Sequence, residues 1–203
     1  MLPVGIRSAE PLPGSDQVPT QHDGAVARYA LLLRGINVGK AHRVPMAELR
    51  ELLSAQGHGE VRTLLQSSNV VLDSDLPAAE LVGTVEPALE ERFGLAVPVV
   101  VRTAEELLAV RARDPLADVA TDPTRYVVSF SADAVPAEVE ERLRAVDPGD
   151  DRYVVDGREL YLGCPHGQLQ SPLGAALAKL RGGPVGTARN WATVGKVADL
   201  LER

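Results

Sequence analysis

A glycine-containing segment near the start of the chain carries residues that could bind an anion. A short apolar run is followed by Arg34-Gly35-Ile36-Asn37-Val38-Gly39-Lys40, and Arg43 comes three residues later. A strand-to-helix turn of this kind can direct backbone N–H groups and cationic side chains at a phosphate. The pattern differs from a P-loop because the GxxxxGK[ST] spacing and its hydroxyl are absent. Glycines that merely permit a tight turn would explain the same residues.

Two further polar segments could contribute to the same site. Gln66-Ser67-Ser68-Asn69 stands between two apolar runs, where an ordinary hairpin turn could also use these residue types. Thr187-Ala188-Arg189-Asn190-Trp191 precedes the last apolar stripe, with Asn190 at the position of a helix N-cap and Trp191 expected in the core. Arg189 would lie beside a helix N-terminus, whose dipole disfavours a cation unless an anion or carboxylate is present.

The charge is distributed unevenly along the chain. The formal net charge is -7 at pH 7, which argues against a protein that coats nucleic acid or an anionic membrane through its overall field. Residues 24–47 and 160–198 nevertheless contain cations and no acid. These two basic stretches are where an anion could bind, although ordinary solvated charges would give the same pattern.

Catalytic and metal-binding patterns are weak. Cys164 and His166 are two residues apart, but no third group can be named that would orient them as a nucleophile and base, so a structural or incidental role is favoured. The single cysteine excludes an internal disulfide, and no Cys/His cluster or metalloenzyme motif is present. The sequence therefore indicates no metal and no cofactor, and it leaves open whether the protein is an enzyme.

The hydrophobic periodicity predicts one order of elements that occurs twice. Strand, helix, strand, strand, helix, strand is expected over residues 28–102, and the same order recurs from residue 120, with a hairpin centred on Asp156-Gly157. The predicted fold class is α+β, a tandem pair of ferredoxin-like (βαββαβ) subdomains with a C-terminal helix. A helix starting at the capping box Thr103-Ala-Glu-Glu106 and a loop, residues 103–119, would connect the first subdomain to the second, residues 120–203.

The region before the first strand is predicted to be different in character. Residues 1–27 are rich in proline and glycine, have no apolar periodicity, and are expected to form a disordered extension. No apolar run is long enough for a secretory signal or a membrane span, so we expect a cytoplasmic protein without a membrane partner.

The predicted topology brings the polar segments together. In a βαββαβ sheet the first and third strands are antiparallel neighbours, so the strand that ends before Arg34 should lie beside the start of the strand at Asn69. The expected ligand is a small molecule that carries a phosphate or carboxylate group. The candidate ligand-binding residues are Arg34, Asn37, Gly39, Lys40, Arg43, Gln66, Ser67, Asn69, Arg189 and Asn190.

Two alternatives from other functional classes stay open. A nucleic-acid-binding module would need an exposed sheet with aromatic side chains, and the predicted strands offer only Tyr29, Tyr126, Phe130, Tyr153 and Tyr161. A scaffold or oligomer-forming protein without a small ligand would instead show a large symmetric apolar patch. The sequence does not indicate the oligomeric state.

Several ordered motifs resemble a bacterial family known as domain of unknown function 1697. They are YALLLRGINVGK with VPMAELRELL, then VRTLLQSSNVVLDS, FGLAVPVVVRTAEEL, GRELYL and TARNWATV, and the resemblance extends from Tyr29 to Leu201. The resemblance implies two ferredoxin-like units in tandem and supplies no activity. Family members usually read INVGGKN, QSGN and TTRNW where this chain reads INVGKAH, QSSN and TARNW, so Ser68 replaces a glycine and Ala188 replaces a threonine.

Overall fold

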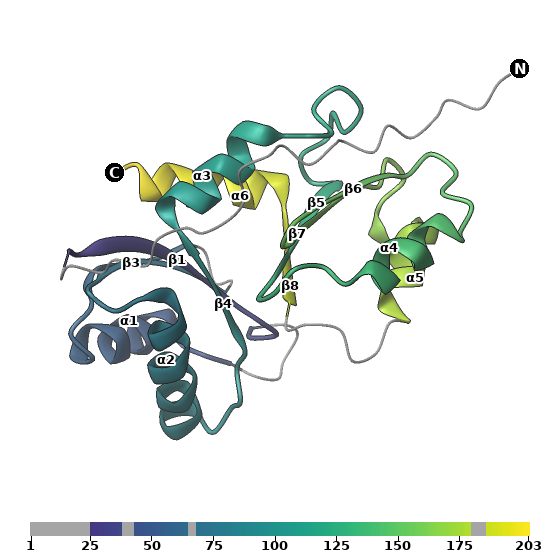
Figure 1. The fold of residues 1–203 in the computed structure, drawn as a ribbon. Helices are drawn as coiled ribbons and strands as arrows, with labels where there is room; N and C mark the ends of the chain where they lie inside the picture. The colour runs from purple at the N-terminus through teal and green to yellow at the C-terminus, as the bar shows by residue number, and fades with distance from the viewer. Residues whose placement is uncertain (1–24, 38–42, 65–67, 180–185) are drawn as a thin grey trace, which may run out of the picture.

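The computed structural model describes residues 25–37, 43–64, 68–179 and 186–203. Within these residues the chain forms two four-stranded antiparallel sheets and six α-helices, an α+β fold (Figure 1). Residues 1–24 of the predicted extension lie outside the described part, and the first strand begins at Ala27, the last residue of that extension. None of the described helices is long and apolar enough to cross a membrane.

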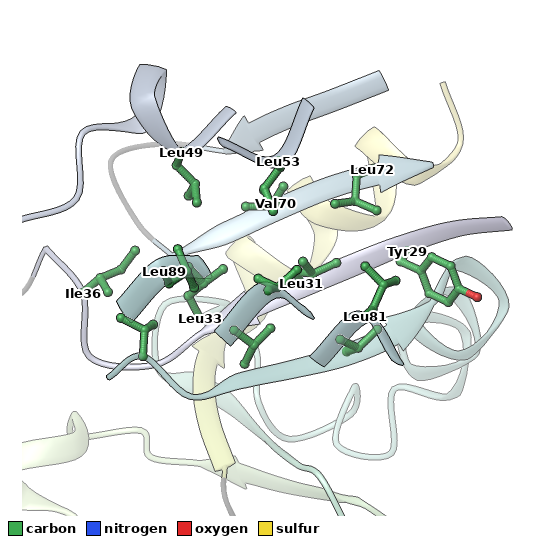
Figure 2. Close-up of a cluster of buried hydrophobic side chains, with 14 of the residues drawn as sticks. Tyr29, Leu31, Leu33, Ile36, Leu49, Leu53, Val70, Leu72, Leu81 and Leu89 are labelled. Carbon is green, nitrogen blue, oxygen red and sulfur yellow. The ribbon is translucent and has the colours of Figure 1, made fainter. Parts of the chain in front are cut away.

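The first sheet has the strand order β2-β3-β1-β4. Its strands are β1 (Ala27–Leu33), β2 (Gly59–Leu64), β3 (Asn69–Ser74) and β4 (Val99–Thr103). Helices α1 (Met46–Ala55) and α2 (Ala78–Phe93) cover one face, where leucines of the strands and helices form a buried cluster (Figure 2). The alternate side chains of β1, Ala30 and Leu32, face the other way and are also buried, so this strand lies in the middle of the molecule.

The ends of these helices follow the local sequence. Pro45 and Pro77 occupy the positions immediately before α1 and α2, where the missing proline N–H costs no helical hydrogen bond. Gly94 ends α2 in the left-handed conformation with φ +65°, which glycine adopts without steric cost. Pro45 therefore marks the start of α1, and Pro77 and Gly94 mark the two ends of α2.

The second sheet repeats the arrangement with the order β6-β7-β5-β8. Its elements are β5 (Tyr126–Ser131), α4 (Ala137–Arg144), β6 (Arg152–Asp156), β7 (Glu159–Gly163), the 3-10 turn η1 (Gln168–Gln170), α5 (Pro172–Ala178) and β8 (Gly186–Asn190). The predicted centre of the β6–β7 hairpin was wrong by one residue. Asp156 pairs with Glu159 as a strand residue, so the turn residues are Gly157 and Arg158. Only Gly157 has positive φ, as in a type II′ turn.

A central core joins the two sheets. The faces not covered by α1, α2, α4 and α5 pack together with α3 (Ala104–Arg113) and α6 (Trp191–Leu201). Trp191 is partly buried there and stacks on Tyr126 with ring centroids 4.7 Å apart, which agrees with the core position expected for it. Both sheets are therefore covered on both faces.

A buried ion pair crosses this central core. Arg102 of β4 is 1% exposed and its Nε donates to Glu159 Oε1 of β7 at 2.8 Å. Its Nη2 donates to the Ser131 carbonyl at the end of β5, and the guanidinium lies over the Phe130 ring. Burial lowers the pKa of Arg102 and the Glu159 carboxylate opposes that shift, so the pair neutralises a charge that could not be buried alone.

We expect Arg102→Ala to lower the free energy of unfolding by about 3–5 kcal/mol, because it leaves Glu159 and the Ser131 carbonyl without their partner. Arg62→Ala removes an arginine whose pair with Glu60 is exposed, and should cost less than about 1 kcal/mol. Urea unfolding of both variants measures the difference. Equal losses would contradict the assignment of Arg102 as a link between the sheets.

Candidate functional site

The end of β1 lies beside the start of β3. Leu32 pairs with Asn69 in antiparallel register, and the Leu33 N–H donates to the Ser68 carbonyl at 2.7 Å. Arg34, the residue that follows β1, donates its backbone N–H to the Pro98 carbonyl at 2.9 Å. The first two polar segments therefore meet at one end of the first sheet in their described residues.

Asn37 clips together the two ends of the segment that follows β1. Its backbone is left-handed with φ +56°, its Nδ2 donates to the Val44 carbonyl at 3.0 Å, and its Oδ1 accepts from the Val44 N–H at 2.9 Å. Ile36 and Val44 beside this clip are buried. Gly39 and Lys40 of the candidate site fall between the two ends and lie outside the described residues, as do Gln66 and Ser67.

Arg189 brings the third polar segment to the same place. From β8 of the second sheet its Nε donates to Asn69 Oδ1 at 2.5 Å, and its Nη2 donates to the carbonyls of Leu33 and Ser68 at 2.8 and 2.9 Å. Asn69 is itself buried. Arg189 of the second sheet therefore contacts the end of the first sheet, where the polar segments after β1 and before β3 were expected to meet.

The other guanidinium nitrogen of Arg189 is bonded within its own strand. Nη1 donates to Thr187 Oγ1 at 2.6 Å and to the Ala188 carbonyl at 2.7 Å. Together with the bonds to the first sheet, these contacts use the five N–H groups of the side chain. All five acceptors are neutral oxygens, so the carboxylate or anion expected beside this helix N-terminus is replaced by protein carbonyl, hydroxyl and amide groups.

The charge of Arg189 has no ionic partner in the described part of the chain. Burial lowers the pKa of Arg189 to about 10, and no nearby carboxylate opposes the shift. A pKa of about 10 leaves the guanidinium charged at neutral pH. Neutral hydrogen bonds satisfy the donors without cancelling the net charge, so this end of the sheet keeps a positive potential.

The remaining candidate residues divide into exposed cations and structural amides. Arg34 and Arg43 are exposed, and their side chains have no hydrogen-bond or ion-pair partner among the described residues. Asn190 is the N-cap of α6, as predicted, and its Oδ1 accepts from the Thr193 N–H at 2.9 Å. The described part of the site therefore has the exposed Arg34 and Arg43, the partly buried Arg189, and amide side chains that are hydrogen-bonded within the protein.

The Cys164 and His166 segment lies at a different place. The Cys164 thiol is buried and burial raises its pKa, which opposes formation of a nucleophilic thiolate. His166 is exposed and pairs with Asp150 at 2.8 Å. A cavity of about 350 Å³ lies at that end of the second sheet, lined by Val119, Ala120, Thr121, Asp122, Arg125, Asp150, Arg152, Gly163, Cys164 and Pro165. Its arginines have acidic neighbours, unlike those at the end of the first sheet.

Residues 26–161 match the family described as "Protein of unknown function (DUF1697)", which is more than half of the chain. The chain belongs to this family. The fold is also similar to that of a conserved bacterial protein, SP0830, from Streptococcus pneumoniae, with 25% sequence identity and a TM-score of 0.74, over 87% of this chain and 99% of that one. The comparison with curated proteins found no match.

This DUF1697 member keeps a left-handed residue where the family resemblance leads one to expect glycine. Ser68 has φ +48°, is 8% exposed, and presents its carbonyl to Leu33 and Arg189. The turn is therefore not restricted to glycine, but a side chain in this conformation is strained. The backbone geometry, rather than the serine hydroxyl, delivers the acceptor to Arg189.

Sequence reasoning missed the backbone acceptors of this site. Every residue has a backbone carbonyl, so the residue types Leu33 and Ser68 do not indicate this role. No sequence pattern indicates that a charged side chain from β8 donates hydrogen bonds to these two carbonyls. Thr187, which bonds Arg189 two residues away, matches the alternation of a strand and could have been named for that reason. No metal site was predicted, and the described residues contain no group of three or more His, Cys, Asp or Glu placed to hold a metal ion.

Replacement by glycine at two left-handed residues should change the free energy of unfolding in opposite directions. Ser68→Gly relieves a strained conformation, keeps the carbonyl, and should raise the free energy of unfolding by about 0.5–1 kcal/mol. Asn37→Gly keeps the conformation but removes both bonds to Val44, and should lower it by about 1–2 kcal/mol. Thermal and urea unfolding measure both variants. Destabilisation by Ser68→Gly would contradict the strain at that turn.

Proposed function

We propose that the protein binds a small anion, bearing a phosphate or carboxylate group, at the end of the first sheet. The observation that carries the proposal is Arg189, a partly buried guanidinium without an ionic partner among the described residues. Proteins rarely bury a charge without an opposite charge nearby, so an anion close to this guanidinium would be favoured through its charge, although the five N–H groups are already bonded to protein oxygens.

Arg34 and Arg43 supply the exposed side of the proposed site. Arg34 directly follows Leu33, whose carbonyl is bonded by Arg189, and Arg43 directly precedes Val44, which the Asn37 clip holds. Because neither arginine has a partner among the described residues, both are available to a ligand. Gly39, Lys40, Gln66 and Ser67 stay proposed contributors, whereas Asn37, Asn69 and Asn190 are proposed to position the site.

We also propose that each sheet with its two outer helices is a ferredoxin-like unit. The first unit spans residues 28–102, residues 103–119 connect the units, and residues 120–203 hold the second unit plus the C-terminal helix. The strand orders β2-β3-β1-β4 and β6-β7-β5-β8 support this assignment, since the central strands of each sheet are its first and third. In this arrangement the anion site belongs to the junction of two units rather than to one of them.

The alternatives draw less support from the described residues. Tyr29, Tyr126, Phe130 and Tyr161 are buried, so they cannot form the stacking platform of a nucleic-acid-binding sheet. Among the described residues, the exposed large apolar side chains are Val26, Val119 and Leu169, which belong to three separate segments. The described part of the chain therefore offers less support for an aromatic platform or a large apolar patch than for the basic site.

Inorganic phosphate and a panel of phosphorylated metabolites, tested by thermal unfolding at constant ionic strength, should raise the melting temperature. A ligand at about 100 times its Kd adds about 2.7 kcal/mol to the free energy of unfolding. In a chain of this size that raises the melting temperature by about 5–10 °C. The Arg34→Ala/Arg43→Ala double variant should fold normally and lose most of this increase, because it removes the exposed cations.

Arg142→Ala is the matched control. Arg142 is an exposed arginine on α4, and its removal lowers the positive charge without touching the proposed site. This variant should keep the increase. Equal loss in the control and the double variant would mean that phosphate acts through general charge, and the absence of any increase in the wild-type protein would refute the proposed function.

A further inference from the structure

Two arginines occupy equivalent positions in the two sheets. Arg102 on β4 pairs with Ala30 of β1, and Arg189 on β8 pairs with Val128 of β5. Each arginine directly precedes the N-cap of the helix that packs in the central core, Thr103 for α3 and Asn190 for α6. The structure therefore contains the same local arrangement twice.

Each guanidinium nitrogen of Arg102 makes a hydrogen bond that has an equivalent at the same nitrogen of Arg189. Arg102 bonds the second sheet from the first, and Arg189 bonds the first sheet from the second. Nη2 of Arg102 donates to the last carbonyl of β5, and Nη2 of Arg189 donates to the last carbonyl of β1. Nη1 of each donates to the carbonyl of its own preceding residue. Each sheet thus contributes one arginine that donates hydrogen bonds to groups at the strand ends of the other sheet.

The Nε partners of the two arginines differ in charge, and Arg189 also donates to the Ser68 carbonyl and to Thr187 Oγ1, two contacts without an equivalent among the bonds of Arg102. Nε of Arg102 donates to the carboxylate of Glu159, the first residue of β7. Nε of Arg189 donates to the amide oxygen of Asn69, the first residue of β3. Asn69 therefore stands where the other half has a carboxylate, and the second arginine lacks the counter-charge that the first one has.

The two ends also differ in access to solvent. Arg102 is 1% exposed, whereas Arg189 is only partly buried and the Ala188 beside its Nη1 is exposed. The residue after β1 is the exposed Arg34, where the corresponding residue after β5 is Ala132. The end that lacks the carboxylate is thus the more open one and has an additional cation.

We propose that the anionic group of the ligand provides to Arg189 the counter-charge that Glu159 provides to Arg102. This inference rests on the proposed function and specifies it: the ligand carries a phosphate or carboxylate that binds at the junction of the two sheets. Binding then neutralises the arginine that links them, so the ligand stabilises their docking as well as occupying a surface site.

Asn69→Asp tests the inference because it supplies the missing carboxylate from the protein itself. The variant should melt at a higher temperature than the wild-type protein without phosphate. Its apparent affinity for inorganic phosphate should fall by about tenfold or more, since Arg189 then already has a negative charge beside it. Gln170→Glu adds the same charge on an exposed residue of η1 and should bind phosphate as the wild-type protein does.

A second variant covers the case in which Asn69→Asp does not fold. Thr187 Oγ1 accepts from Nη1 of Arg189, so Thr187→Asp places a carboxylate on the other side of the same guanidinium and should also weaken phosphate binding. Phosphate binding at wild-type affinity in a folded Asn69→Asp or Thr187→Asp variant would overturn this inference and leave the proposed function standing. No phosphate binding by the wild-type protein would overturn both.

Discussion

A guanidinium taken out of water needs an acceptor for each of its N–H groups, and this requirement governs how the two sheets of the protein fit together. Arg102 and Arg189 each find acceptors at the strand ends of the opposite sheet and further acceptors in their own strands. Because backbone carbonyls are among these acceptors, the strands must end at fixed positions relative to each other. Apolar packing in the central core supplies the burial, and the two arginines select one alignment of the sheets.

This requirement explains features that look unrelated along the chain. Ser68 accepts a strained backbone because its carbonyl must face Arg189, and Asn69 is buried because its amide oxygen must do the same. The clip between Asn37 and Val44 fixes the chain on the far side of Arg34. Some of the polar residues that suggest an anion site therefore also have a structural role. The proposed ligand would bind at a site whose geometry is already fixed by the contacts between the two sheets.

Most of the fold can be predicted from the sequence because its signals are local. The capping box at Thr103 and the N-cap at Asn190 are short-range patterns, and the structure has them where they are predicted. The hairpin after β6 was misplaced by one residue because an Asp-Gly pair suits a type I′ turn, whereas cross-strand pairing places Asp156 in the strand.

The composition of the site could be predicted only in part. The pairing of β1 with β3 follows from topology, so Arg34 and Asn69 could be placed at one sheet end. The contact between Arg189 and Asn69 joins residues 120 positions apart in different sheets, and no local pattern encodes it. The equivalence of Arg102 and Arg189 becomes visible only when the strand registers are compared, because the surrounding residues differ.

We propose that Arg189 is an inter-sheet arginine whose charge a bound anion balances, as Glu159 balances the charge of Arg102. The most direct measurement follows the arginine Nε–H resonances of the isotope-labelled full-length protein during titration with inorganic phosphate. Both Nε–H groups should be protected from solvent exchange, and only the Arg189 resonance should shift and become further protected as phosphate is added. Rapid exchange at Arg189, or shifts of equal size at both arginines, would contradict this proposal.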